Sequence, residues 1–277
     1  MISIKDIHTF QEERRILLRA NEFICLRPHP SLCQYISNYN ITFPTKNLIP
    51  ASFTAIPNGC ATLSIEMDNK NLFVNLDGPI TKPYIYGNLL NQLKMVVSIE
   101  FSPAGLYALT GIPQSKLTDT TLPFDAVNPK LTQSIYDVVE KAKSTHELVT
   151  GLDMLLLENM YTEHHPQLKF ALQNIITYAG NTSVKWLSDE THYSERQLNR
   201  LFNQHIGMSA KSFSRLIRIN KTFRLLKKPS NSITLISDVM GFHDLSHFVR
   251  DFKSVCGVTP QEYRNNMSDF YINTGKF

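Results

Sequence analysis

Arginine, asparagine, histidine and serine residues recur at helical spacing in two stretches of the C-terminal third of the chain. The first stretch presents Arg196, Asn199, Arg200 and Asn203, and the second presents Ser246, His247, Val249, Arg250 and Lys253. Arg can hold guanine O6 and N7 with two hydrogen bonds, and Asn can do the same with adenine N6 and N7. Nearby Lys and Arg side chains would contact phosphates and set the register. We therefore predict that these side chains form a DNA-binding surface.

Both stretches lie in an internal repeat, in which residues 184–213 resemble residues 233–263. Leu187-Ser188-Asp189 matches Ile236-Ser237-Asp238 at an offset of 49, whereas Arg200-x-Phe202 matches Arg250-x-Phe252 at an offset of 50. The extra residue falls between Phe242 and Phe248, in a turn, where two copies of a helix-turn-helix would tolerate it. We predict a first helix-turn-helix over residues 184–203 and a second over residues 233–253.

Each copy has the residues that a helix-turn-helix needs, with a first helix packed across a second that faces the major groove. Ser188 and Ser237 are small enough for the helix crossing. Gly241 can adopt the unusual backbone angles of the turn in the second copy. Ser194 and Asp244 are suited to cap the exposed N–H groups of the second helices.

The second helix of each copy must also be amphipathic, with one face towards the core and the other towards the DNA. The predicted inner faces are Leu198, Leu201 and Phe202 in the first copy, and Leu245, Phe248, Phe252 and Val255 in the second. Between the copies, Ala210 to Lys228 reads as an uninterrupted helix, which would span about 28 Å at 1.5 Å per residue. A turn of DNA is about 34 Å, so both recognition helices could enter successive major grooves.

Composition is that of a globular protein, with 42% hydrophobic and 19% charged residues. Residues 166–267 hold 14 Lys and Arg against 7 Asp and Glu, while residues 1–165 hold 13 against 16. The asymmetry suggests an anionic partner for the C-terminal part alone. No apolar run reaches the length of a transmembrane helix, and the N-terminus lacks the apolar core of a signal peptide. We expect a cytoplasmic protein without a membrane partner.

The sequence of the N-terminal part predicts a β-rich domain, and an all-α domain is expected to follow it. The expected fold class is therefore α+β. Residues 61–67, 71–76 and 92–101 have strand length and composition, and residues 130–160 repeat apolar side chains at helical spacing. We expect a regulatory domain over residues 1–160, a linker over 161–167 and a DNA-binding domain over 168–267. The two helices of 130–160 either pair with another chain or pack on the β-domain.

Residues 167–264 resemble the DNA-binding domain of the AraC/XylS transcription regulators. The resemblance rests on the double repeat, on Gly241-Phe242 with Ser246-x-Phe248-x-Arg250-x-Phe252-Lys253, and on Gly257-x-Thr259-Pro260-x-x-Tyr263-Arg264. It implies seven helices, two of them recognition helices, joined by the long helix. It also implies that positions matching Arg196, Asn199 and Arg200, and those matching Leu245, Ser246, Val249 and Arg250, approach bases or backbone. The chain departs from the family in having Leu245 where a polar residue is frequent.

The stretch FSPAGLYALTGIPQSKLTD, residues 101–119, is similar to a segment in the N-terminal domains of some AraC-type regulators. That likeness implies a β-rich domain that senses a signal or dimerises. The candidate partners are therefore promoter DNA, RNA polymerase, a small-molecule effector and a second copy of the chain. Aromatic residues of this region either line an effector pocket or pack in the core, and no effector-binding residue is assigned: Phe23, Tyr35, Tyr39, Phe43, Tyr84 and Tyr86.

Two alternatives to an effector-controlled regulator stay open. A second protein, rather than a metabolite, could dock on residues 1–160. An enzyme related to DNA-repair methyltransferases would need a reactive Cys framed by Pro and by His or Arg. Pro28-His29-Pro30 stands near Cys33, but no cysteine has the expected neighbours. We therefore expect no catalytic residue and no cofactor. His164-His165 lacks a third metal ligand and is expected to be a solvated pair in the linker.

Overall fold

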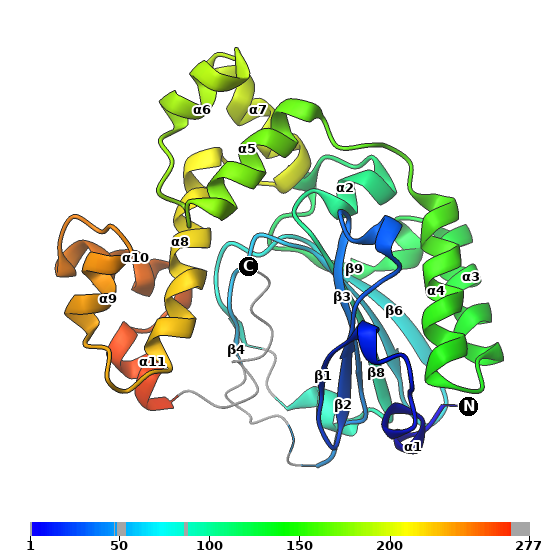
Figure 1. The fold of residues 1–277 in the computed structure, drawn as a ribbon. Coiled ribbons are helices and arrows are strands. Elements are labelled where there is room, and N and C mark those ends of the chain that lie inside the picture. The colour runs from blue at the N-terminus through cyan, green and yellow to red at the C-terminus, as the bar shows by residue number, and fades with distance from the viewer. Residues whose placement is uncertain (1, 47, 49–53, 86–87, 267–277) are drawn as a thin grey trace.

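A computed structural model describes residues 2–46, 48, 54–85 and 88–266 of the 277-residue chain. Within these residues, every strand lies in the first half of the chain, and helices alone follow from Pro129 onwards (Figure 1). The strands form one domain with helices packed against it, and the C-terminal helices form a second domain beside it. This arrangement confirms the predicted α+β fold class.

The N-terminal domain is built on one antiparallel sheet of seven strands in the order β1-β2-β3-β8-β5-β6-β9. The strands are β1 (Ile16–Arg19), β2 (Phe23–Leu26), β3 (Ile36–Thr42), β5 (Thr62–Met67), β6 (Leu72–Asp77), β8 (Met95–Phe101) and β9 (Thr121–Pro123). A separate pair consists of β4 (Thr54–Ala55) and β7 (Tyr84–Ile85). The three strands expected from sequence correspond to β5, β6 and β8.

The sheet buries one row of side chains across its centre. Strand β8 pairs with β3 on one side and with β5 on the other, so that Ile99 stands between Tyr39 and Leu63. All three side chains are fully buried. Because side chains alternate between the faces of a strand, their neighbours two residues along line the same face. That row consists of Val97, Ile41 and Ile65, which are also fully buried.

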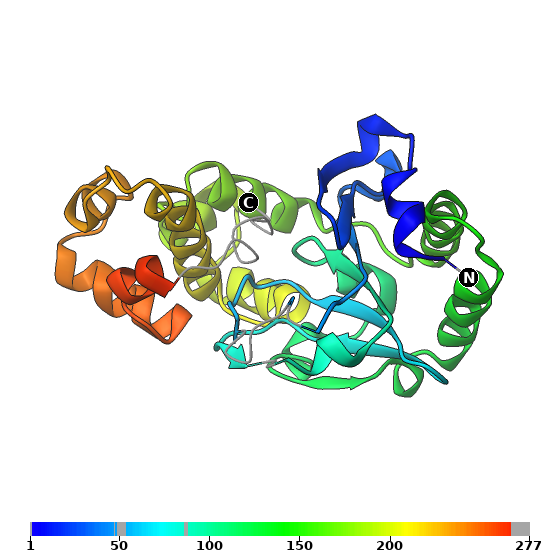
Figure 2. The same cartoon turned by 90° about the horizontal axis from the view of Figure 1, so that it is seen from below.

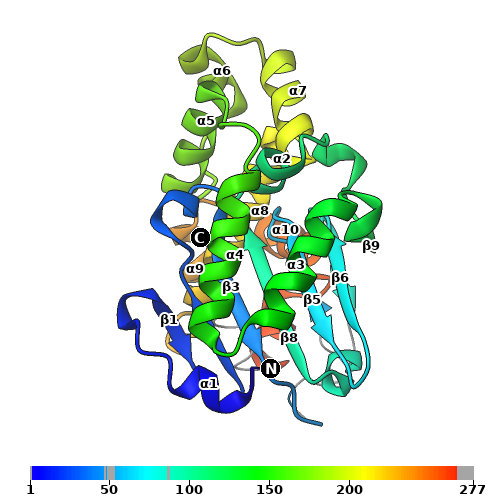
Figure 3. The same cartoon turned by 90° about the vertical axis from the view of Figure 1, so that its right-hand side faces the viewer.

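Two amphipathic helices, α3 (Pro129–Lys141) and α4 (Thr145–Asn159), lie across a face of the sheet (Figure 3). Asn128 and Ser144 cap their N-termini with side-chain oxygens. The inward side chains of both helices belong to the same core as the strands: Ile135, Val139, Leu148, Leu152 and Leu156. The helices expected over residues 130–160 therefore pack on the β-domain.

Shorter helical elements of this domain are α1 (Ile4–His8), α2 (Gly105–Thr110), η1 (Glu13–Arg15), η2 (Pro30–Leu32), η3 (Leu89–Gln92), η4 (Gln114–Lys116) and η5 (Phe124–Ala126).

A buried carboxylate ties α4 to the sheet. Asp153 Oδ2 lies 2.8 Å from Arg15 Nη2. Its Oδ1 accepts hydrogen bonds from the Tyr39 hydroxyl and from the backbone N–H of His29, each at 2.9 Å. Burial, followed by the charge of Asp153, raises the pKa of Tyr39, so the phenol stays protonated. Buried charges are tolerated only when they are paired and hydrogen-bonded, so this cluster determines the position of α4 on the sheet.

The C-terminal domain consists of helices α5 (Pro166–Thr177), α6 (Val184–Thr191), α7 (Glu195–Ile206), α8 (Ala210–Leu226), α9 (Ile233–Val239), α10 (Leu245–Cys256) and α11 (Pro260–Asn266). Helix α8 ends two residues before the predicted Lys228 and spans about 25 Å. It contributes to two separate cores, one with α5–α7 and one with α9–α11. Figure 2 shows α9–α11 at the end of the molecule farthest from α3 and α4.

The two domains are joined by direct contacts. Gln204 Nε2 on α7 donates to the Tyr107 hydroxyl on α2 at 2.7 Å, and Thr118 Oγ1 donates to the Gly207 carbonyl at 3.0 Å. Asn220 Nδ2 on α8 donates to the Pro57 carbonyl at 2.9 Å. Ala104, just before α2, packs in the core formed by α5–α8. The segment 101–119 thus lies against the C-terminal end of the first recognition helix.

The prediction that His164 and His165 are solvated is wrong. His164 is partly buried, with its ring 4.8 Å from that of Tyr35 and its Nε2 3.1 Å from the Gln34 carbonyl oxygen. The preceding backbone also binds the N-terminal domain, because the Tyr161 N–H donates to the Ala108 carbonyl at 2.8 Å. These contacts join residues far apart in sequence, so the polar composition of the segment gave no sign of them.

Candidate nucleic-acid interface

The first helix-turn-helix is formed by α6 and α7. His192 ends α6 with a φ of 56°, so it holds the left-handed position that Gly241 occupies 49 residues later. Ser188 is buried at the crossing and its hydroxyl donates to the Tyr193 carbonyl. Ser194 caps α7 by accepting from the Gln197 N–H, while the Gln197 side chain accepts from the Ser194 N–H. This reciprocal pair, a capping box, fixes where α7 begins.

The second helix-turn-helix is formed by α9 and α10, and it has the predicted turn and cap. Gly241 has a φ of 69°, and Ser237 is fully buried beneath the crossing. Asp244 Oδ1 accepts from the His247 N–H at 2.7 Å. This hydrogen bond, followed by one with the His243 ring, lowers the pKa of Asp244, so the cap is ionised at neutral pH.

The inner faces agree with the prediction at every position except Leu245. Leu198, Leu201 and Phe202 are buried in α7, as are Phe248, Phe252 and Val255 in α10. Leu245 is 39% exposed. It is the first residue of α10, and the core beside it is filled by Phe242, whose ring lies 4.8 Å from that of Phe248. Leu245 is therefore placed on the surface, at the N-terminal end of the recognition helix.

The outward residues of α7 fall into two groups. Arg196, Arg200 and Asn203 are exposed. Asn199 is half-buried, and its Oδ1 accepts from the backbone N–H of Ala210 at the start of α8, at 3.1 Å. A bidentate contact with adenine uses both the oxygen and the nitrogen of the amide. In this conformation the Asn199 oxygen is already bound to α8, so Asn199 links the recognition helix to the long helix.

On α10, the side chains of Ser246, Arg250 and Lys253 are exposed, and those of His247 and Val249 are half-buried. His247 Nε2 lies 3.3 Å from Asp251 Oδ2, and the imidazole meets the ring of Phe242 edge-on at 5.5 Å. These contacts hold the His247 ring at the edge of the core. The side chains of Arg250 and Lys253 extend into solvent.

Sequence reasoning missed Arg218, which lies on α8 between the two units. Its Nη2 donates to the Gly180 carbonyl at 2.7 Å, and its guanidinium stands 5.3 Å from the centre of the Phe242 ring. Burial lowers the pKa of this Arg. Gly180 permits the close approach of α8 to the α5–α6 turn, since a Cβ at position 180 would stand 2.1 Å from the Ser214 carbonyl oxygen. Arg218 therefore joins the α5–α6 turn to the turn of the second unit and has a structural role.

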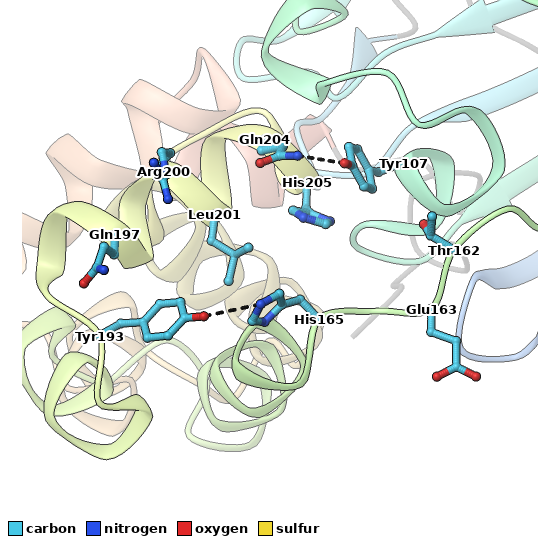
Figure 4. A pocket seen from close by; sticks show the side chains of 10 residues that line it. All are labelled: Tyr107, Thr162, Glu163, His165, Tyr193, Gln197, Arg200, Leu201, Gln204 and His205. Carbon is cyan, nitrogen blue, oxygen red and sulfur yellow. Dashed lines mark hydrogen bonds between the residues drawn. The ribbon is translucent and has the colours of Figure 1, made fainter.

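A pocket beside α7 was also not foreseen. Its volume is about 420 Å³, within the range of about 300–1,000 Å³ usual for small-molecule sites. Gln197, Arg200, Leu201, Gln204 and His205 form one wall, and the others are Tyr107, Thr162, Glu163, His165 and Tyr193 (Figure 4). Burial, and then the nearby His164 and His165, lower the pKa of His205 to about 4. The lining comes from three separate stretches of chain, so no local pattern could have indicated it.

The aromatic residues considered for an effector site differ in burial, and two further aromatic residues, Tyr193 and Trp186, belong to the first helix-turn-helix. Tyr193 places its hydroxyl 3.3 Å from His165 Nε2, and Trp186 packs near Phe170 and Tyr178 while staying 37% exposed. Tyr35 and Tyr39 are buried in the sheet core, and Phe43 packs against it. Phe23 is half-buried, Tyr84 is 53% exposed, and Tyr86 lies outside the described residues.

Cysteine and metal chemistry find little support in the described part of the chain. No disulfide joins the four cysteines, and burial raises the pKa of Cys256 and raises that of Cys25 to about 12. Those shifts are opposite to the activation of a thiolate. Among the described residues, no cluster of three or more His, Cys, Asp or Glu side chains could hold a metal ion. In the same part of the chain, no helix is long and apolar enough to cross a membrane.

Comparison with known families defines the class of the C-terminal domain. Residues 187–266 match the model of a helix-turn-helix domain, and residues 25–123 match a domain of unknown function, DUF6597. The matched helix-turn-helix region covers both units described above. The C-terminal part of the chain is an AraC-type helix-turn-helix domain, which confirms the resemblance drawn from its sequence.

The chain is also similar to individual regulators. An uncharacterized HTH-type transcriptional regulator of Haemophilus influenzae is 23% identical over 266 residues, which cover 94% of this chain and 83% of that protein. The HTH-type transcriptional activator RhaS of Pectobacterium atrosepticum is 31% identical over 135 residues, or 47% of this chain and 48% of RhaS. The chain thus aligns with about half the length of that second relative.

Two solved structures illustrate the range of structural likeness. An AraC-type DNA-binding regulator from Chromobacterium violaceum is 27% identical with a TM-score of 0.34, covering 37% of this chain and 96% of that one. ToxT from Vibrio cholerae is 15% identical with a TM-score of 0.43, covering 80% of this chain and 96% of that one. Neither is close enough to define how the two domains of this chain are arranged.

Proposed function

We propose that the chain is a sequence-specific DNA-binding regulator of transcription. The observation that carries this proposal is the presence of two complete helix-turn-helix units at the two ends of one helix, α8 (Figure 1). Each unit has a capped recognition helix whose outer face carries an exposed Arg, Arg200 in α7 and Arg250 in α10. Recognition helices joined in this way are suited to enter successive major grooves of one duplex.

Individual roles follow from side-chain chemistry and exposure. Arg196, Arg200 and Arg250 are assigned to guanine edges or to phosphates. Asn203 and Ser246 are exposed hydrogen-bonding groups for bases or backbone, and Lys253 is assigned to a phosphate. Val249 offers an apolar surface for a thymine methyl group. Asn199 and His247 contribute through their position at the edge of the surface, because each already holds a contact within the domain.

Regulation is proposed to act through the N-terminal domain, since that domain contacts α7 directly through Tyr107 and Thr118. A bound small molecule, a second copy of the chain or RNA polymerase could each shift that contact. Met154 and Leu157, which are 57% and 38% exposed on α4, give a second copy or a protein partner an apolar face. The chain is proposed to act without catalysis and in the cytoplasm, with domain limits at residues 1–160 and 168–267.

Selection of binding sites from random-sequence duplex DNA by the full chain tests this function. We expect enrichment of two short motifs whose centres lie about one helical turn apart, about 10 base pairs. Enrichment of a single motif would contradict the use of both units. Binding that stays the same for every sequence would contradict a sequence-specific regulator.

A further inference from the structure

The pocket beside α7 lies where the two domains and the segment between them meet. Tyr107 comes from α2 in the N-terminal domain, Thr162 and His165 come from the connecting segment, and Arg200 and Gln204 come from α7. In Figure 4, Gln204 and His205 of α7 lie beside Tyr107, and Leu201 of α7 points towards His165. A molecule held here would contact both domains at the same time.

One wall carries a cation that the protein itself does not neutralise. Arg200 is exposed, and no carboxylate of the described residues lies within ion-pair distance of it. A guanidinium group binds a carboxylate through two parallel hydrogen bonds, which adds both energy and geometric selectivity. Glu163, the acidic residue of the lining, lies on the connecting segment and away from Arg200 in Figure 4.

The remaining walls combine hydrogen-bonding groups with flat apolar surfaces. The Tyr107 oxygen accepts a hydrogen bond from Gln204, so its own O–H can be donated to a bound molecule. Tyr193 and His165 are held together by a contact of 3.3 Å between the hydroxyl and Nε2. With Leu201 they form a surface on which a ring can pack, since aromatic side chains offer flat apolar faces.

We propose that this pocket is a regulatory site for a small, ring-bearing organic carboxylate, with Arg200 as the counter-ion of the carboxylate. The ring packs against Tyr193, His165 and Leu201, and Tyr107 donates a further hydrogen bond from the N-terminal domain. The pocket volume of 420 Å³ admits a molecule of this size.

The consequence for DNA binding rests on the proposed function. Arg200 is also assigned to the DNA surface, and its guanidinium cannot bind the ligand and a base or phosphate together. The carboxylate and DNA therefore compete for one side chain. Because coupling between two ligands is reciprocal, DNA lowers the affinity for the carboxylate by the same factor by which the carboxylate lowers that for DNA.

The first experiment measures the thermal unfolding of the full chain in the absence of DNA. The probes are benzoate, phenylacetate and cyclohexanecarboxylate, each beside its neutral amide. A ligand that binds the folded state raises the midpoint temperature with its concentration. We expect at least one carboxylate, and no amide, to do so. The shift should disappear in Arg200→Gln and persist in Arg196→Gln, a change of the same kind on the same helix at a residue outside the pocket.

The proposal is overturned if no carboxylate raises the midpoint, if an amide does so equally, or if the shift survives in Arg200→Gln. Because this experiment contains no DNA, its outcome is independent of the proposed function.

The second experiment adds DNA of the selected sequence to the chain saturated with the active carboxylate. The affinity for DNA should fall by about 5- to 150-fold, the usual size of coupling between two sites. The matching amide should leave the affinity unchanged. An affinity for DNA that stays the same under saturating carboxylate overturns the regulatory role.

Discussion

Arg250 and Lys253 lie close together on the exposed face of α10 but are assigned different partners. We expect Arg250→Ala to weaken binding to the selected site by about 1–3 kcal/mol and to relax the preference at one base pair. Lys253→Ala should weaken binding to all sequences and reduce the salt slope by about one unit. Titrations of specific and nonspecific duplexes at several salt concentrations separate the two. Equal loss on both duplexes in Arg250→Ala would assign that Arg to a phosphate.

Asn199 tests whether a residue on the outer face of α7 also maintains the fold. Its Oδ1 accepts from the Ala210 N–H, one of the groups that α8 leaves without a partner in its first turn. We expect Asn199→Ala to lower the free energy of unfolding by about 1 kcal/mol, the net value of a typical hydrogen bond. Chemical denaturation of the isolated variant measures this without DNA.

The matched control is Asn203→Ala, one turn further along α7. The Asn203 side chain is exposed and donates to the Asn199 carbonyl of the same helix. Its removal should change the free energy of unfolding by less than about 0.5 kcal/mol, as is usual for a surface position. A larger loss in Asn203→Ala than in Asn199→Ala would place the link to α8 elsewhere.

At the scale of the elements, the position of α4 depends on one buried charge. Asp153→Asn keeps the shape of the side chain but leaves Arg15, 17% exposed, without its counter-ion. Breaking a buried ion pair by removing one partner costs about 3–5 kcal/mol. We expect a loss of that size in the free energy of unfolding, measured by urea denaturation and circular dichroism.

The exposed pair of Asp137 and Lys141 on α3 provides the comparison. Its side chains are 51% and 79% exposed and 3.5 Å apart. Asp137→Asn should change the free energy of unfolding by no more than about 1 kcal/mol, because water screens exposed pairs. If both substitutions cost the same, the burial of Asp153 does not determine the stability of α4.

The elements whose residues follow local rules could be predicted from sequence. The two units of the C-terminal domain were foreseen because cap residues such as Ser194 and Asp244, the turn residue Gly241 and the apolar stripes all act within a few residues. The strands β5, β6 and β8 were foreseen from apolar runs between turn residues. The prediction that Leu245 is buried was wrong. A stripe of apolar residues predicts the direction in which each side chain points from the helix axis, but it does not predict where the element packed against the helix ends.

Contacts between distant segments could not be predicted in this way. The Tyr107–Gln204 hydrogen bond joins residues 97 positions apart, and the Asp153 cluster joins α4 to residues more than 100 positions earlier. Neither leaves a periodic pattern. The residues that line the pocket come from three separate segments of the chain. The pocket therefore forms only where the two domains are in contact. The sequence therefore predicted the exposed residues on the outer faces of α7 and α10, but it did not predict the pocket.

At the scale of the whole molecule, the domain contact contains a histidine that burial keeps neutral. His205 is 7% exposed, and its ring centre lies 3.9 Å from that of Tyr107. Burial, followed by His164 and His165, lowers its pKa from the ordinary 6.5 to about 4. Below pH 6.5 the unfolded chain binds a proton at this residue that the folded chain does not. The contribution of neutral His205 is therefore complete above pH 6.5 and is lost as the pH falls towards 4.

We expect the midpoint temperature of the full chain to fall between pH 6.5 and pH 4, with a smaller fall in His205→Gln, which cannot take up the proton. Carboxylates and other histidines also titrate in this range, so the informative quantity is the difference in slope between the two proteins. His8→Gln, at an exposed residue of α1 outside the domain contact, is the control variant for the loss of a histidine. His205→Gln is expected to have a lower midpoint at every pH, because the packing against Tyr107 changes, and this does not affect the slope. An identical slope in the original chain and in His205→Gln would show that protonation of His205 does not weaken the contact between the domains.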